Sequence, residues 1–189
     1  KQLFAAPSPE TLRVFLDKAG RRKEFSAQTV APFLKHPEKS LQKAVLFALP
    51  RLEDKAAAPD VAGLLAHQDP EIRADAVTAL GMLDGKGFAS RIAEMMEDGH
   101  AEVRHAAIMQ LKNFCDSSYA PQVAKRLKDA KAWTRATADE ILEKLGDKSY
   151  APALAPLLND PDALVCSNAI HALTMLDGKT YVQQIAKLL

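Results

Sequence analysis

The sequence has little of what would indicate several common protein classes. Its two cysteines, Cys115 and Cys166, are too few for a disulfide framework, and unpaired cysteines favour a reducing, cytoplasmic compartment. Lysine and arginine number 25 against 24 acidic residues, so the basic excess typical of a nucleic-acid-binding protein is missing. No apolar run approaches the ~20 residues of a membrane-spanning helix. We therefore expect neither a nucleic-acid partner nor membrane insertion.

What the sequence does contain is an internal repeat of 31 residues. From about residue 38 to the end, positions 31 apart carry similar residues without any insertion or deletion. A fixed period of this kind is typical of proteins whose stacked units share one continuous core. Three columns show it best: Leu49, Leu80, Leu111, Leu142 and Leu173; Val45, Ala76, Ala107, Ala138 and Ala169; and Phe88, Tyr119, Tyr150 and Tyr181.

Each unit has the pattern of two helices joined by a polar turn. Ile72, Ala76 and Leu80 lie four residues apart and form the apolar stripe of a first helix. A second, shorter stripe includes Ile92, and the glycine-rich segment 84–87 separates the two. The pattern predicts an all-α fold, a right-handed α-solenoid of antiparallel helix pairs.

We predict a single solenoid domain over residues 1–189. Residues 38–189 hold five regular units, and residues 1–37 form a variant N-terminal unit with a first helix at about 9–19 and a second at 26–35. A solenoid normally ends in a capping repeat with a polar outer face. The last unit instead stops inside its second helix, and the chain begins without methionine. We therefore expect the chain to be a fragment of a longer protein.

Prolines mark the second helices. Pro59, Pro121 and Pro152 share a column at the start of this helix, where proline is well tolerated. Pro32 and Pro156 share a column in its middle, where proline should kink the helix or delay its start. We predict locally altered curvature at these two positions.

These columns resemble HEAT repeats, in the short form of about 31 residues that is called phycobilisome-lyase-like. The motif that carries the resemblance is Asp-Pro-Glu-Ile-Arg-Ala-Asp-Ala-Val-Thr-Ala-Leu-Gly at 69–81, with related segments at 101–108 and 145–154. The resemblance covers nearly the whole chain. It implies a solenoid that binds other macromolecules, commonly on the concave side lined by the second helices.

The resemblance also implies a structural role for one polar column. In the family, an aspartate between helices and an arginine six residues later commonly tie adjacent units together. Asp98 with Arg104 and Asp129 with Arg135 match that spacing. Cys166 stands six residues after the next such aspartate, Asp160, so the last unit departs from the pattern and the tie is in doubt there.

No residue set predicts catalysis, a metal site or a cofactor. The five histidines share no column and show no paired ligand spacing. We therefore predict a protein that is not an enzyme and acts as an interaction scaffold or adaptor for a protein or peptide partner. Three alternatives stay open: a HEAT-like enzyme, a bilin-lyase-type protein that handles a chromophore, and a regulatory module of a larger enzyme.

Positions that break a regular repeat are good candidates for function. Arg126 and Asp139 stand in otherwise apolar columns, and Trp133, the only tryptophan, stands where earlier units carry glutamate. One hypothesis is that Trp133 and Leu164 form an exposed apolar patch near Lys131 that anchors a partner. The alternative is a rotated helix that buries Trp133, exposes the following threonine and pairs Arg126 with Asp139.

A second candidate surface lies on the second helices. Its outward positions are polar to basic in one segment, and a solvated face is the ordinary interpretation of such residues. The candidate partner-binding residues there are Arg91, Gln122, Lys125 and Lys128.

Overall fold

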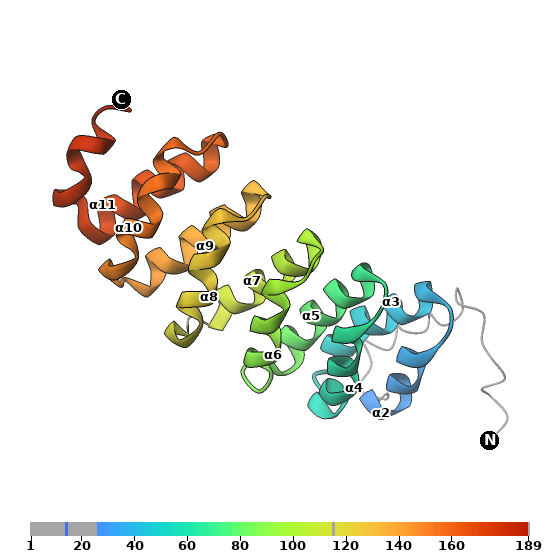
Figure 1. Ribbon diagram of the computed structural model, residues 1–189. Helices are drawn as coiled ribbons and strands as arrows, with labels where there is room; N and C mark the ends of the chain where they lie inside the picture. The colour runs from blue at the N-terminus through green and yellow to red at the C-terminus, as the bar shows by residue number, and fades with distance from the viewer. Residues whose placement is uncertain (1–13, 15–25, 115, 189) are drawn as a thin grey trace, which may run out of the picture. The chain divides into compact units, whose positions relative to one another are not determined.

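The computed structural model describes Val14 and residues 26–114 and 116–188, and every element within them is a helix (Figure 1). The predicted helix at 9–19 lies outside the described residues, apart from Val14. The chain divides into two compact units, an N-terminal unit, Lys1–Met95, and a C-terminal unit, Met96–Leu189. The single domain over 1–189 stays a prediction, and the two units are described separately.

Over residues 26–95, the N-terminal unit consists of short helices that alternate with long ones. Its two long helices, α3 and α5, pack against each other, and α5 also packs against the shorter α4. The elements are α2 (Ala27–Val30), η1 (Ala31–Lys35), α3 (Lys39–Ala48), η2 (Leu49–Leu52), η3 (Lys55–Ala57), α4 (Ala58–Gly63), η4 (Leu64–Ala66), α5 (Pro70–Asp84) and α6 (Ala89–Glu94), followed by η5 (Met95–Glu97) at the boundary between the units.

The C-terminal unit repeats the same plan. The long helix α9 packs against both α7 and α11, while α8 packs against α9 and α10 against α11. α11 comprises two helical segments that meet at Asp177, whose backbone is not helical (φ −156°, ψ 54°). The elements are α7 (Ala101–Phe114), η6 (Ser117–Tyr119), α8 (Ala120–Lys125), η7 (Arg126–Lys128), α9 (Ala132–Leu145), η8 (Lys148–Tyr150), α10 (Ala151–Leu154), η9 (Ala155–Asn159) and α11 (Ala163–Ile185).

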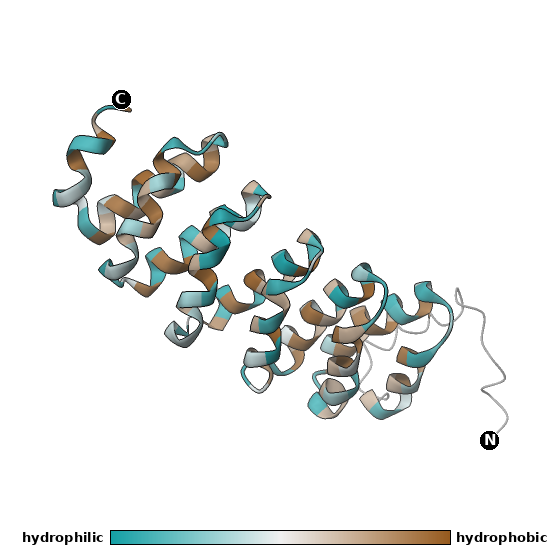
Figure 2. Cartoon of the chain, in the orientation of Figure 1, coloured by the Kyte–Doolittle hydropathy of each residue, from teal (hydrophilic) through white to brown (hydrophobic). Residues whose placement is uncertain are grey.

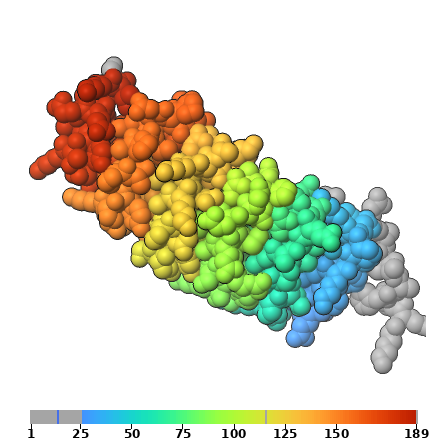
Figure 3. Space-filling model, in the orientation of Figure 1, coloured from blue at the N-terminus to red at the C-terminus, as the bar shows by residue number. Residues whose placement is uncertain are grey.

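Equivalent positions of successive repeats are buried alike in both units. Every member of the leucine column that begins at Leu49 is at most 3% exposed, and every member of the column that begins at Val45 is fully buried. Apolar and polar residues are interspersed along the helices (Figure 2), and the outer face shown in Figure 3 is closely packed within each unit. Alanine dominates the second column, so neighbouring helices can approach closely. In these two columns, residues 31 apart therefore occupy equivalent buried positions, as predicted.

The two mid-helix prolines shorten the α-helical part of their second helices. In α4 and α8 this part is six residues long and a 3-10 segment of three residues follows. In the pairs α2–η1 and α10–η9, which contain Pro32 and Pro156, the α-helical part has four residues and the 3-10 part five. Proline lacks the N–H that an α-helix needs and crowds the preceding turn. The helices begin at the usual column, so their start is not delayed.

Candidate functional site

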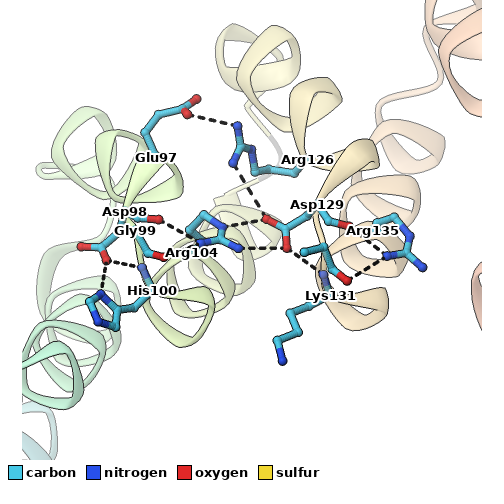
Figure 4. A network of polar contacts seen from close by, with 10 residues as sticks. Glu97, Asp98, Gly99, His100, Arg104, Arg126, Asp129, Lys131 and Arg135 are labelled. Carbon is cyan, nitrogen blue, oxygen red and sulfur yellow. Dashed lines mark hydrogen bonds and ion pairs between the residues drawn. The ribbon is translucent and has the colours of Figure 1, made fainter.

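The most regular polar feature is a pair of arginine–aspartate contacts in the C-terminal unit, the first of which, between Arg104 and Asp129, is shown in Figure 4. Arg104 donates from Nε and Nη2 to the two carboxylate oxygens of Asp129, at 2.7 and 3.1 Å. Arg135 makes the same two contacts to Asp160, both at 2.7 Å. Each arginine also donates from Nη1 to a carbonyl oxygen six residues earlier, that of Asp98 or Asp129. One guanidinium thus holds the turn before its own helix and a carboxylate one repeat ahead.

This geometry corrects the expected direction of the tie. Asp98 and Asp129 contact the arginine six residues later through their backbone carbonyls, whereas the Asp129 carboxylate receives the arginine of the preceding repeat, 25 residues earlier. Asp160, where Cys166 puts the tie in doubt, still receives one from Arg135 of the preceding repeat. Cys166 donates instead to the carbonyl oxygen of Leu158, at 3.1 Å.

Burial makes these contacts strong. The arginine side chains are 12–13% exposed and the two aspartates 2% and 6%. Burial by itself would raise the pKa of Asp129, but hydrogen bonds from Arg104 and from the backbone N–H of Lys131 outweigh it and lower the pKa. The hydrogen bond from Arg135 likewise lowers the pKa of Asp160. All three nitrogens of each guanidinium are engaged within the protein, so these two arginines join repeats.

Arg126 extends this network and does not pair with Asp139. Its side chain is 16% exposed; Nη2 lies 3.0 Å from a carboxylate oxygen of Glu97, and Nη1 lies 3.9 Å from one of Asp129. Asp139, in contrast, is fully buried and lies on α9, whereas Arg126 lies in η7. The pairing of Arg126 with Asp139 that the rotated-helix hypothesis expected is therefore wrong.

Trp133 lies on the outer side of α9. It is 44% exposed, whereas Thr134 is fully buried, so the predicted rotation of the helix is wrong. Its ring meets the imidazole of His105 edge to face, with 5.6 Å between centroids, and the Lys131 ammonium lies 5.4 Å from the ring centroid. Both distances are within the range of attractive contacts. The tryptophan is thus held on one side and open to solvent on the other.

Further exposed apolar side chains lie on the neighbouring helices α7 and α11. Met109 on α7 is 38% exposed, and its sulfur lies 3.8 Å from the hydroxyl of Thr137, one turn beyond Trp133. Leu164, the equivalent of Trp133 on α11, is 63% exposed. We call this surface, made of Met109, Lys131, Trp133 and Leu164, the Trp133 face.

The predicted second-helix surface is less coherent. Arg91 donates to the carbonyl oxygen of Ala62 at 2.9 Å and so fastens α6 to α4. It belongs to the N-terminal unit, whereas Gln122, Lys125 and Lys128 belong to the C-terminal unit. Lys125 and Lys128 are exposed, and Gln122 is partly buried. Within one unit, the surface is reduced to these three residues.

The residue whose environment sequence reasoning missed is Asp139. Neither of its carboxylate oxygens has a hydrogen-bond partner among the described residues. The sequence does indicate an unusual environment, because Asp139 is charged whereas the equivalent residues of the preceding repeats are Leu46, Val77 and Ile108. Among the described residues, no group of three His, Cys, Asp or Glu side chains could hold a metal ion, and no helix is long and apolar enough to cross a membrane.

Stacked helix pairs with a shared core and periodic ties define a repeat protein of the α-solenoid class. A family model described as HEAT repeats matches residues 27–112, 88–174 and 120–189. The chain therefore belongs to the HEAT-repeat family, as its 31-residue columns predicted. No curated protein matches the sequence.

Solved structures with the same architecture confirm the all-α solenoid. The complex of CpcE and CpcF of phycocyanin lyase from Nostoc sp. PCC7120 is similar, with a TM-score of 0.69 and 19% identity over 86% of this chain and 69% of that one. The Escherichia coli protein YibA gives a TM-score of 0.74 and 15% identity over 98% and 72%. A designed armadillo repeat protein in complex with the peptide (KR)4 gives 0.64 and 16% over 92% and 96%. At these identities the likeness shows the fold alone.

Proposed function

We propose that the chain is a non-catalytic scaffold that binds a protein or peptide partner through the Trp133 face. The observation that carries the proposal is the position of the only tryptophan, which is 44% exposed although it is the largest apolar side chain available for the core. Exposed apolar residues that cluster on neighbouring elements typically mark interaction sites. Tryptophan in particular is enriched among the residues that carry most of the binding energy of an interface.

The immediate surroundings of Trp133 suit an anchor. His105 supports one edge of the ring, so little side-chain freedom is left to lose on binding. Burial lowers the pKa of His105, which keeps this support neutral near pH 7. Lys131 lies beside the ring and supplies one cation at the edge of the apolar surface. A partner segment with an apolar anchor and a neighbouring carboxylate would match this arrangement.

The second-helix surface is the weaker candidate. Lysine is depleted at the centres of protein interfaces, since ordering its long side chain and removing its hydration shell are unfavourable. No large apolar side chain is exposed beside Lys125 and Lys128 on α8 and η7, unlike Trp133 on α9. We therefore place the anchor on the Trp133 face. The likeness to the phycocyanin lyase complex concerns fold alone, so we propose no lyase activity.

The proposal is tested by cross-linked capture on the intact protein, followed by affinity measurements with the partner that is identified. We expect Trp133→Ala to cost about 2 kcal/mol, or roughly thirtyfold in Kd, and Leu164→Ala to weaken binding less. Phe47→Ala, which removes an exposed aromatic of the N-terminal unit, is the matched control. Circular dichroism establishes that each variant is folded.

Lys125→Glu distinguishes the two surfaces. If this variant abolishes binding while Trp133→Ala leaves it intact, the partner sits on the second helices and the proposed surface is wrong. If neither variant changes Kd, both candidate surfaces are wrong.

A further inference from the structure

Asp139 is a carboxyl group in a position built for an aliphatic side chain. The equivalent residues of the preceding repeats are Leu46, Val77 and Ile108, and each of them is at most 2% exposed. Asp139 itself is 0% exposed and lies in the middle of α9. This helix packs against α7, α8, η7 and α11, so the carboxyl group is enclosed by elements on several sides.

No partner compensates for this burial. Neither carboxylate oxygen accepts a hydrogen bond among the described residues. The nearby charges of its own helix, Glu140 and Glu143, have the same sign as an ionised Asp139 and act against ionisation. An ionised carboxylate in such a place is unfavourable, because it loses its hydration and gains nothing in exchange.

The cations on the surrounding elements are engaged with other acids or directed to solvent. His171 of α11 acts in favour of the charged form of Asp139, but its Nδ1 lies 3.0 Å from a carboxylate oxygen of Glu143. Lys125, Lys128, Lys131, Lys144 and Lys179 are exposed. The remaining cations are paired as Lys112 with Glu140, Arg104 with Asp129, Arg126 with Glu97, and Arg135 with Asp160.

We propose that Asp139 is a proton-controlled latch of the C-terminal unit: α9 and α11 pack as observed while its carboxyl group is protonated, and their packing loosens when the proton is lost. α11 is the element affected because it makes the most extensive contact with α9, the helix that holds Asp139. The device needs no ligand.

The direction of the pH effect follows from linkage. Burial, with smaller contributions from Glu143 and Glu140, raises the pKa of Asp139 to about 7, and His171 opposes this only in part. The folded state therefore holds a proton that the unfolded chain releases near pH 4. The stabilisation is complete below the unfolded pKa and is lost as pH rises through the folded pKa, so the sensitive window runs from about pH 4 to about pH 7.

The experiment is equilibrium urea unfolding at pH 5, 6, 7 and 8. Unfolding is monitored by the fluorescence emission of Trp133, which lies on the same helix as Asp139. Wild type is compared at each pH with Asp139→Asn and with Asp139→Leu, which restores the aliphatic column. Comparison at equal pH cancels the contribution of His105 and of other groups that do not act on Asp139. We expect the folding constant of wild type to fall, relative to both variants, by up to about tenfold per pH unit below pH 7 and then level off.

Asp60→Asn is the control, because Asp60 is an exposed aspartate of the N-terminal unit; its pH profile should run parallel to that of wild type. Profiles of Asp139→Asn and Asp139→Leu that run parallel to wild type would overturn the proposal. Should a variant fail to fold, a carboxyl ¹³C NMR titration of wild type decides: an Asp139 signal that titrates near pH 7 supports the latch, and one that titrates near pH 4 refutes it. Amide exchange in α11 that does not quicken between pH 6 and 8, after correction for intrinsic rates, would also contradict it.

Discussion

Arg104 and Asp129 show how much depends on single paired charges inside a solenoid. Truncation of Arg104 to alanine leaves the carboxylate of Asp129, which is only 2% exposed, without its main partner. Breaking a buried ion pair in this way typically costs 3–5 kcal/mol, because an uncompensated charge stays buried. Some exposure of the arginine places the expected loss at about 3 kcal/mol in the free energy of unfolding of the C-terminal unit, measured by urea denaturation.

Lys55→Ala provides the comparison. Its ammonium also forms an ion pair across a repeat, 2.9 Å from a carboxylate oxygen of Asp84, but the lysine is 69% exposed. A pair in solvent contributes little, and we expect a loss below about 1 kcal/mol. Equal losses in the two variants would contradict the view that burial makes the arginine tie strong.

At the scale of helices, the end of α9 depends on one glycine. Gly146 follows the last helical residue with φ +68°, and its N–H donates to the carbonyl oxygen of Glu143 at 2.9 Å. A Cβ atom there would meet no neighbour within 4 Å, so the cost of Gly146→Ala is conformational strain alone. We expect a destabilisation of about 1 kcal/mol, measured by thermal or urea unfolding.

Gly63→Ala is the matched control, because a Cβ atom has equal space there but the backbone is helical. Alanine is the better helix former, and this variant should gain up to about 1 kcal/mol. The same sign of change in both variants would show that the left-handed conformation of Gly146 is not what matters.

The periodic sequence determines most of the elements but not all of their details. The columns that begin at Leu49 and Val45 identify the buried face of each first helix, since identical spacing repeats the same packing environment. They cannot show where an α-helix changes to a 3-10 helix, because that depends on the hydrogen bond that Pro32 or Pro156 removes. Similarly, the spacing of Asp98 and Arg104 indicates a contact but not which of two neighbouring repeats the guanidinium reaches.

The candidate site was predictable only in part, for a related reason. A break in the column identifies Trp133 and Asp139 as unusual, and the outward position of Trp133 follows from its equivalence to Glu102. The partner of a buried charge depends on distances in three dimensions and on which cations are already engaged. Arg126 pairs with Glu97, and Asp139 has no hydrogen-bond partner among the described residues. The spacing of these residues in the sequence does not predict either outcome.

At the scale of the molecule, carboxyl groups whose pKa values are shifted in opposite directions should give a stability maximum in mildly acidic solution. The raised pKa of Asp139 makes the protein less stable as pH rises toward 7, whereas the lowered pKa values of Asp129 and Asp160 make it less stable once pH falls below their ordinary range near 4. His105, whose pKa is lowered by burial, adds to the loss on the acidic side of its ordinary value.

The measurement is the urea midpoint between pH 2 and 8. Wild type should give a dome, Asp139→Leu should flatten the neutral limb, and Arg104→Ala should weaken the acid limb. A midpoint that increases steadily from pH 4 to 8 would contradict the assignment of Asp139 as the dominant raised group.

The forward reach of the arginines bears on how such an array can change in length. Donor and acceptor of each tie belong to consecutive repeats and lie 25 residues apart, within one 31-residue period. A tandem duplication of residues 132–162 would therefore arrive with a donor and an acceptor already in register. The array can therefore lengthen by duplication of a whole repeat at the Arg135–Asp160 contact without any compensating substitution. A copy of the α11 unit would lack that fastening, since Cys166 stands in place of the arginine.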